Sequence, residues 1–205
     1  NWGCIPTKAL LRNAEIFQLI KDSHKYGIQI NDYTIDWQKI IKRSRNIAKR
    51  LSKGIEYLMK KNKIDVINGY GSLVDENNVK VVSKGGEQTI YASHIIISTG
   101  ASPNWFPGLE PDGKDIITYK DALIVKEKPK HIIIIGAGAI GVEFAYYFNT
   151  FGSQVTIIEA KDTILPNEDE DISKELTRIF KRRKISIKTK TIVEKISKLK
   201  KGLKV

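Results

Sequence analysis

The sequence contains little sulfur, with one cysteine and one methionine among its 205 residues. A lone cysteine excludes a disulfide within the chain as given, and low cysteine content is typical of a reducing compartment. Long apolar runs are also missing: the longest are a few residues, whereas a membrane-spanning helix needs about 18 or more. The start shows no secretory signal and no initiating methionine. We therefore expect no membrane partner, and we interpret the chain as an internal fragment.

Acidic residues are scarce relative to basic ones, 23 against 35, which gives a formal net charge of +12. Such a balance fits either nucleic-acid binding or a lysine-rich solvated surface. The basic segment from Gln38 to Glu56 contains no aromatic residue, so it offers no platform for base stacking. We therefore favour a solvated basic face and expect no nucleic-acid partner. No metal site is predicted.

Hydrophobic periodicity predicts two helices in the first part of the chain, one from Pro6 to about Ile20 and one from about Asp36 to Lys61. Gly27 and the residues after it interrupt the pattern. The residues expected on the buried sides are Leu10, Leu11, Ala14, Phe17 and Leu19 in the first helix, and Trp37, Ile40, Ile41, Ile47, Leu51, Ile55 and Leu58 in the second.

The hydrophobic period changes to two after Lys63, which predicts strands. Their expected positions are Asp65–Val74, Val79–Val82, Gln88–Tyr91 and His94–Ser98, with a tight turn at Lys84–Glu87. The segment "SPNWFPGLEPDGKD" is rich in proline, glycine and polar residues and reads as a linker. We place a domain boundary near its end, at Asp115. Beyond it, residues 168–196 predict a helix followed by a strand.

The segment His131–Ala160 has the pattern of a nucleotide-binding unit. A strand predicted at His131–Ile135 leads into a G-x-G-x-x-G sequence, formed by Gly136, Ala137, Gly138, Ala139, Ile140 and Gly141. In such a loop the first glycine allows a tight turn, the second lets a pyrophosphate approach the backbone, and the third lets helix and strand pack closely. The N-terminus of the next helix then faces the phosphates. The expected packing positions of that helix are Val142, Ala145, Tyr146 and Phe148.

An acidic residue, Glu159, closes the following strand, "SQVTIIEA", about 20 residues after the glycine loop. A carboxylate at this place can accept hydrogen bonds from both ribose hydroxyls and would repel a 2′-phosphate, so NAD is favoured over NADP. The alternative is a tight strand–helix turn that binds nothing. The strand, helix, second strand and acid together favour nucleotide binding more strongly than a glycine motif alone.

Cys4 lies just before Pro6, at the start of the first predicted helix. A thiol there feels the positive end of the helix dipole, and Lys8, one turn further, adds a second positive charge. Both favour ionisation below the free thiol pKa of about 8.5. The alternative is a small buried hydrophobe, the usual role of a lone cysteine. Spacing alone leaves both interpretations open.

The segment "NWGCIPTKALL" resembles the redox-active segment of the flavin-dependent pyridine nucleotide–disulfide oxidoreductases. Cys4 matches the second, flavin-proximal cysteine of that family, and the first would precede Asn1. "VINGYGSL" resembles the segment that passes the adenosine of FAD, and "TIYASHIIISTGASP" resembles the strand that ends in a Thr-Gly pair against FAD. A glycine there permits close backbone approach, although both segments also fit ordinary turn chemistry.

The resemblance implies roles for individual residues. Lys8 and Glu143 match positions that form an ion pair beside the flavin, and Ile192 matches a backbone contact to the adenine of NAD. Cys4 is the implied catalytic residue. The implied cofactor-binding residues are Lys8, Gly71, Thr99, Gly100, Ala101, Gly136, Ala137, Gly138, Ala139, Ile140, Gly141, Val142, Glu143, Glu159 and Ile192.

Within the family the sequence is most similar to the dihydrolipoamide dehydrogenases. Glutathione reductase-like relatives use NADPH and usually carry a basic residue near the position of Glu159, and mercuric reductases also prefer NADPH. The resemblance implies electron transfer from dihydrolipoamide through a cysteine disulfide and FAD to NAD⁺. The alternatives are another disulfide reductase of this family, or a non-catalytic NAD-binding module in which Cys4 is incidental.

The architecture implied is α/β, with two Rossmann-like dinucleotide-binding domains for FAD and NAD, both incomplete in this chain. Residues 1–115 would be the C-terminal part of the FAD-binding domain with the cysteine helix, and residues 116–205 a truncated NAD-binding domain. The implied partners are dihydrolipoamide on a lipoyl-domain acyltransferase of a 2-oxo acid dehydrogenase complex, and a second copy in a homodimer. The expected location is the bacterial cytoplasm or the mitochondrial matrix, and this fragment alone is expected to be inactive.

Overall fold

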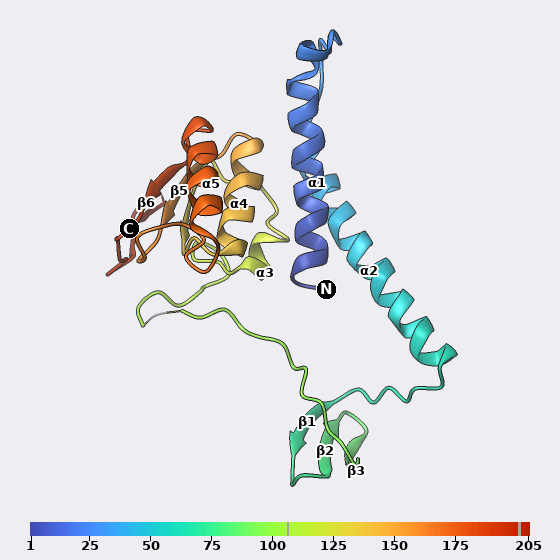
Figure 1. Cartoon of the computed structure of the whole chain (residues 1–205). Helices are drawn as coiled ribbons and strands as arrows, with labels where there is room; N and C mark the ends of the chain where they lie inside the picture. Colours follow the sequence, from blue (N-terminus) through green and yellow to red (C-terminus); the bar gives the residue numbers. More distant parts are fainter. Residues whose placement is uncertain (106, 201) are drawn as a thin grey trace. The chain divides into compact units, whose positions relative to one another are not determined.

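The computed structural model describes residues 1–105, 107–200 and 202–205, so Phe106 of the predicted linker lies outside the described residues. The chain divides into two compact units, shown with their elements in Figure 1. One unit combines Asn1–Leu51 with Asn104–Val205, and the other is Ser52–Pro103. The two units are defined by how compactly their residues pack in space. They do not test the domain boundary near Asp115, which stays a prediction.

The larger unit contains a three-stranded parallel sheet in the order β4-β5-β6. Parallel neighbours need a crossover connection, and helices provide both crossovers here. The sheet and its crossover helices are β4 (His131–Ile135), α4 (Ala139–Thr150), β5 (Gln154–Ile158), α5 (Glu170–Arg182) and β6 (Ser186–Lys188). The strand, loop, helix and strand predicted from His131 to Glu159 are therefore confirmed, and so are the later helix and strand.

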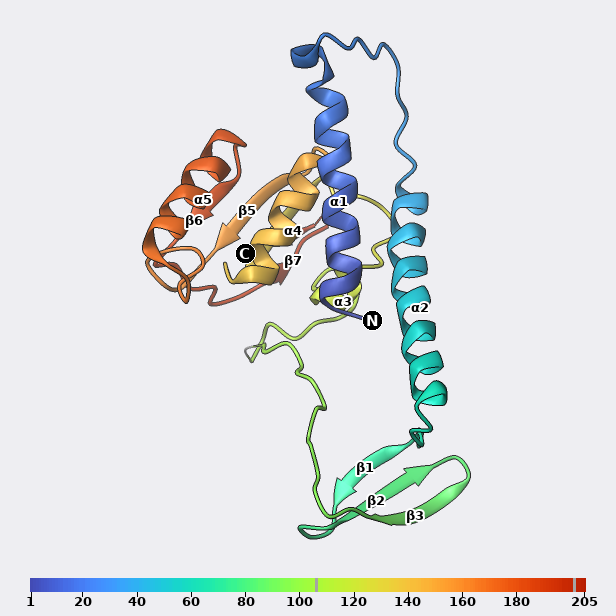
Figure 2. The ribbon, with the colours of Figure 1, turned by 45° about the vertical axis from the view of Figure 1, so that its right-hand side comes forward.

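Further helices complete this unit. In Figures 1 and 2, α1 lies beside α4, and the two helices are in direct contact. The ring of Trp37, at the start of α2, lies 5.4 Å from the ring of Tyr147 and 5.6 Å from that of Phe151. The remaining elements are α1 (Cys4–Lys21), η1 (Ser23–Tyr26), α2 (Trp37–Lys61), α3 (Tyr119–Ala122), β7 (Ser197–Lys198) and β8 (Leu203–Lys204). Only the part of α2 up to Leu51 belongs to this unit, and the rest belongs to the smaller one.

The core joins the sheet to the helices that cover it. Its most deeply buried apolar residues are Leu10, Ala14, Leu123, Ala145, Tyr147, Phe148, Val155, Ile157, Ile164 and Phe180. Buried side chains from α1, α4 and β5 thus form one apolar cluster. This cluster fixes the cysteine helix against the nucleotide-binding unit.

The predicted buried sides of α1 and α2 are only partly correct. Ile41 is buried as expected, but Leu19 is 49% exposed, and Leu51 and Ile55 are 44% and 57% exposed. Leu58, further along α2, is also exposed. An apolar stripe marks which side of a helix can be buried, but burial also requires a packing partner. The partner is present at the start of α2, and the described residues do not cover its second half.

The smaller unit is an antiparallel three-stranded sheet in the order β1-β2-β3. The strands are β1 (Tyr70–Leu73), β2 (Asn78–Ser83) and β3 (Gly86–Tyr91). The predicted turn joins β2 to β3, where Gly86 has a φ of +115° that favours glycine. Two strand predictions are wrong: His94–Ser98 forms no strand, and Asp65–Val74 is reduced to β1. A strand needs a hydrogen-bonding neighbour, and the sheet ladders include no neighbour for these residues; Ile96 is 90% exposed.

Tyr147 should tolerate loss of its hydroxyl better than loss of its ring. The side chain is 1% exposed, and within the described residues its hydroxyl has no hydrogen-bond partner. An unsatisfied buried polar group costs about 1–3 kcal/mol, so Tyr147→Phe should leave the unfolding free energy unchanged or raise it by about 1 kcal/mol. Tyr147→Ala should lower it by about 3–5 kcal/mol. Urea denaturation measures both, and a clearly destabilised Tyr147→Phe would contradict the structure.

Burial also raises the pKa of the Tyr147 phenol above its usual value of 10.0. The unfolded chain then loses this proton at a lower pH than the folded chain does. The contribution to stability is therefore complete below about pH 10 and declines as the pH rises further. Tyr147→Phe should flatten this alkaline decline when denaturation midpoints are compared across the range.

Candidate functional site

The three glycines of the loop each meet a different structural need. Gly136 has a φ of +99°, which favours glycine. A Cβ placed at Gly141 would lie 2.2 Å from the Gly136 carbonyl oxygen, so only glycine allows helix and loop to pack this closely. Among the described residues, a Cβ at Gly138 would meet no atom within 4 Å, which leaves space there for a ligand.

The N-terminus of α4 presents backbone donors at this loop. Gly138 is the N-cap and contributes no side-chain cap. Ala139 and Ile140 are exposed, and N–H groups in the first turn of a helix lack intrahelical partners. The N–H of Val142 already donates to the Gly138 carbonyl at 3.1 Å, and its side chain is buried. The loop and the first turn of α4 therefore carry the kind of free donors with which helix N-termini bind anions.

Glu159 is buried at the end of β5, and its carboxylate holds the glycine loop. Oε2 accepts a hydrogen bond from the Ala137 N–H at 2.7 Å, and Oε1 accepts one from the Lys161 N–H at 2.9 Å. Sequence reasoning missed this loop-fixing role, because a contact across the ends of two strands leaves no signal in residue spacing. Each carboxylate oxygen can accept a further hydrogen bond, so capacity for ribose hydroxyls remains. Ile192, 76% exposed, follows Thr191, whose N–H donates to the Glu159 carbonyl.

Cys4 is the first residue of α1, and its side chain is exposed. One turn further, the Lys8 ammonium donates to Glu143 in the first half of α4. The predicted contact between these two side chains is therefore present. The Glu143 carboxylate, which accepts this hydrogen bond, is the main cause of a raised Lys8 pKa. Because the Lys8 side chain is 63% exposed, solvent screening limits the pair to about 0–1 kcal/mol of stability.

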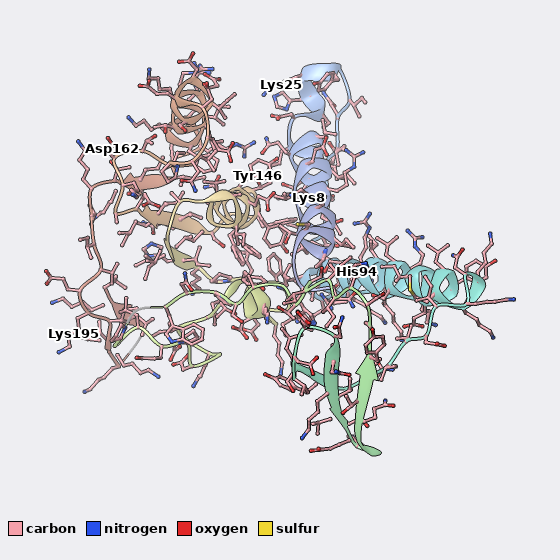
Figure 3. All side chains as sticks on the ribbon, turned by 60° about the horizontal axis from the view of Figure 1, so that its bottom comes forward. Lys8, Lys25, His94, Tyr146, Asp162 and Lys195 are labelled. Atoms are coloured by element: carbon pink, nitrogen blue, oxygen red, sulfur yellow. The ribbon has the colours of Figure 1, made fainter. Side chains whose placement is uncertain are left out.

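A second contact shows that α1 and α4 run in the same direction. Lys21, the last residue of α1, donates to the carbonyl of Thr150, the last residue of α4, at 2.7 Å. The Lys8–Glu143 pair joins the helices nearer their starts, and Figure 3 shows Lys8 on α1 beside the helix that carries Tyr146. The N-termini of the two helices, with Cys4 on one and the glycine loop on the other, therefore lie at the same end. Sequence reasoning missed this contact of Lys21, because its partner lies 129 residues further along the chain.

The remaining predicted cofactor residues belong to the smaller unit. Gly71 lies in β1, paired with Val81 of β2. Thr99, Gly100 and Ala101 are exposed, and Gly100 has a φ of +78° that favours glycine. A positive φ at Gly100 fits a backbone turned for close approach of a ligand. Within the described part of the chain, no helix is long and apolar enough to span a membrane, and no acidic, histidine or cysteine cluster could hold a metal.

A parallel strand–helix–strand unit with a glycine loop and a terminal acid is the pattern of dinucleotide-binding folds, and α1 adds a cysteine at the same end. Comparison with known families agrees with this class. Residues 1–205 match the family described as pyridine nucleotide-disulphide oxidoreductase. The chain belongs to this family, as predicted from its sequence, and the predicted α/β class is confirmed.

Curated relatives are similar over most of the chain. A dihydrolipoyl dehydrogenase of Chlorobaculum parvum is 44% identical over 188 residues, which are 91% of this chain and 40% of the relative. A dihydrolipoyl dehydrogenase of Zymomonas mobilis is 42% identical over 198 residues, which are 96% of this chain and 42% of the relative. The chain thus spans about two fifths of the length of these relatives.

Solved structures are also similar to this chain over nearly its whole length. The flavoprotein disulfide reductase RclA of Escherichia coli is 32% identical with a TM-score of 0.79, over 99% of this chain and 42% of that one. LpdA of Mycobacterium tuberculosis has a TM-score of 0.89 at 24% identity, over 98% of this chain and 44% of that one, and shows the likeness of fold.

Proposed function

We propose that this chain is part of a flavoprotein oxidoreductase that passes electrons from dihydrolipoamide, through a cysteine disulfide and FAD, to NAD⁺. The observation that carries the proposal is the parallel pairing of α1 and α4, which sets Cys4 and the glycine loop at one end. An electron path from thiol to nicotinamide needs these two groups on the same side of the protein. The names of the curated relatives support the choice of substrate.

The residues of the glycine loop are suited to bind NAD. The space at Gly138 and the start of α4 would receive the pyrophosphate, and Glu159 would accept hydrogen bonds from the adenosine ribose. Ile192 lies beside Glu159 through the Thr191 hydrogen bond and would border the adenine. The carboxylate is fixed before any ligand arrives, because two backbone N–H groups hold it. NAD is therefore expected to bind to a formed site.

In the smaller unit, Gly71 and the Thr99–Ala101 segment are proposed to contact FAD. In the larger unit, the family resemblance assigns Lys8 and Glu143 to the flavin. When bound, FAD would supply the two-electron chemistry that links a dithiol to a nicotinamide. Lys8 would hold positive charge near the ring, and Glu143 would fix the position of the Lys8 ammonium through their ion pair. The turn at Gly100 would let the backbone approach the cofactor closely.

Cys4 would be one partner of the disulfide that the substrate reduces. In the family pattern the partner of this cysteine, the first of the pair, would precede Asn1. The two thiols of dihydrolipoamide would be oxidised to a disulfide, while NAD⁺ would gain a hydride and one proton would be released. The N-termini of α1 and α4 place positive charge at this end, where the Lys8 ammonium is paired with the Glu143 carboxylate. The proposal extends to a homodimer and to a lipoyl-domain acyltransferase of a 2-oxo acid dehydrogenase complex as partner.

Substrate selection by the full-length protein that contains these residues tests the proposal. Purified protein should show flavin absorbance and should reduce NAD⁺ with dihydrolipoamide as donor. The likeness to RclA favours one alternative, a different disulfide reductase of the family. That alternative predicts flavin absorbance with oxidation of the reduced coenzyme by another disulfide, such as glutathione disulfide, and no use of dihydrolipoamide. A protein that binds NAD⁺ without flavin would instead indicate a non-catalytic module.

A further inference from the structure

The first three residues of the chain are each held by a contact with a helix. The carbonyl of Asn1 accepts a hydrogen bond from Arg45 Nη1 of α2 at 2.7 Å. The guanidinium of Arg45 also lies over the ring of Trp2, 4.0 Å from the ring centroid. The carbonyl of Gly3 accepts a hydrogen bond from the Thr7 hydroxyl of α1 at 2.8 Å. Side chains from α1 and α2 therefore fix this segment together.

Arg45 makes two of these three contacts, and no acidic side chain competes for its charge. Among the described residues it forms no ion pair with a carboxylate. Its side chain is half-buried, whereas Lys49 and Arg50, further along α2, are exposed. A planar guanidinium can stack on a ring and donate in a fixed direction at the same time. Arg45 thus joins the Trp2 side chain to the backbone of the residue before it.

Arg43 makes a contact of a similar kind at a different place. Its Nη1 donates to the Ala9 carbonyl at 3.2 Å and to Asn13 Oδ1 at 3.0 Å. Both acceptors belong to α1 itself. The two arginines of α2 therefore divide the work: Arg43 holds α1, and Arg45 holds the segment that precedes Cys4.

We propose that Arg45 and Trp2 form a clasp that positions the segment between the two cysteines of the redox disulfide. This inference rests on the proposed function, in which the partner of Cys4 precedes Asn1. The segment that Arg45 holds would then be part of the loop that the disulfide closes. Arg45 is a positioning residue in this account, since it acts through the segment and takes no part in the exchange of electrons.

The clasp should favour the closed, oxidised form of this loop. Dihydrolipoamide would give two electrons and two protons to the disulfide, which breaks the S–S bond and opens the loop, while the donor becomes a disulfide itself. Closing the loop again costs conformational entropy, and a segment that is already ordered loses less of it. The clasp therefore lowers the reduction potential of the disulfide.

The reduction potential of the disulfide in the full-length protein tests the clasp. The protein is equilibrated with mixtures of reduced and oxidised dithiothreitol, free thiols are alkylated, and the fraction of disulfide at Cys4 is measured by mass spectrometry. In Arg45→Gln the disulfide should be about tenfold less stable, which makes its potential about 30 mV less negative. Trp2→Ala should shift the potential in the same direction, whereas Trp2→Phe keeps a ring under the guanidinium and should stay close to the unchanged protein.

The double variant Arg45→Gln/Trp2→Ala tests whether the two side chains act together. Residues that share one interaction have effects that do not add, so the shift of the double variant should be close to that of the larger single variant. Shifts that add in full would show that the two residues act separately, and the clasp would be wrong.

Arg43→Gln is the matched control. It removes the same charge from the same helix and also releases a contact with α1, but it leaves the segment before Cys4 untouched. A purely structural role would lower the urea midpoints of both arginine variants without separating their potentials. If Arg45→Gln has the same potential as Arg43→Gln, the clasp is wrong and the proposed function stands. If Cys4 forms no disulfide within the oxidised full-length protein, the proposed function fails and the clasp with it.

Discussion

Alanine at Gly141 is expected to unfold the dinucleotide unit, whereas alanine at Gly138 is expected to prevent dinucleotide binding and leave the fold intact. The two positions lie in one loop, but they have opposite surroundings. A Cβ at Gly141 would collide with the Gly136 carbonyl oxygen, a backbone atom that cannot rotate away, whereas a Cβ at Gly138 would meet no atom of the described residues within 4 Å. The collision should cost at least the upper end of the about 1–3 kcal/mol typical of overpacking.

Denaturation and NAD⁺ titration of the same two variants separate these effects. Gly138→Ala should change the unfolding free energy by less than about 0.5 kcal/mol, because the backbone there has an extended conformation that alanine adopts easily. Its NAD⁺ affinity should fall by at least about tenfold, since the added methyl group occupies the space assigned to the pyrophosphate. Gly54→Ala, at an exposed position in α2, is the matched control for glycine replacement. Unaltered NAD⁺ binding by a folded Gly138→Ala would contradict the assignment of the loop.

Replacement of Cys4 by serine is expected to abolish dihydrolipoamide oxidation by the full-length protein. A hydroxyl has nearly the shape of a thiol but cannot enter disulfide exchange, which proceeds by attack of sulfur on sulfur. Loss of a nucleophile of this kind lowers turnover by on the order of a thousandfold or more. The exposed position of Cys4 at the first residue of α1 makes a folding defect an improbable cause.

The oxidation of NADH by an artificial quinone acceptor is the internal control for Cys4→Ser. This reaction uses the proposed flavin and nicotinamide sites but bypasses the disulfide, so the variant should retain it. Loss of both reactions would indicate damage to the cofactor sites, and retention of both would show that Cys4 takes no part in electron transfer. Only loss of the thiol reaction alone agrees with the proposed role.

The nucleotide-binding unit could be predicted from the sequence because its causes are local. Gly136 must adopt a positive φ, Gly141 must leave room for a carbonyl oxygen, and Glu159 must end a strand. Each requirement acts within a few residues of the chain and therefore leaves a readable pattern. The turn between β2 and β3 was predictable for the same reason, since Gly86 carries a conformation that few other residues allow.

Features that depend on distant neighbours were not predictable in this way. The segment His94–Ser98 contains three consecutive isoleucines, which favour a strand, yet no described strand pairs with it. The apolar stripe of α2 is partly buried where Trp37 meets the ring of Tyr147 in α4 and is exposed at Ile55. The parallel direction of α1 and α4 follows from contacts such as Lys21 with Thr150, which lie far apart in the sequence. Hydrophobic periodicity shows which face of a helix or strand is apolar. It does not show which other element packs against that face.

Titration of the isotope-labelled chain with NAD⁺, followed by the backbone amide resonances, tests the central claim most directly. The amide signals of Gly138, Ala139 and Ile140 should shift and saturate, because these groups would receive the pyrophosphate, while those of the β2–β3 hairpin should stay in place. Shifts confined to the hairpin, or no shift at the glycine loop under saturating NAD⁺, would contradict the assignment of this loop as the dinucleotide site.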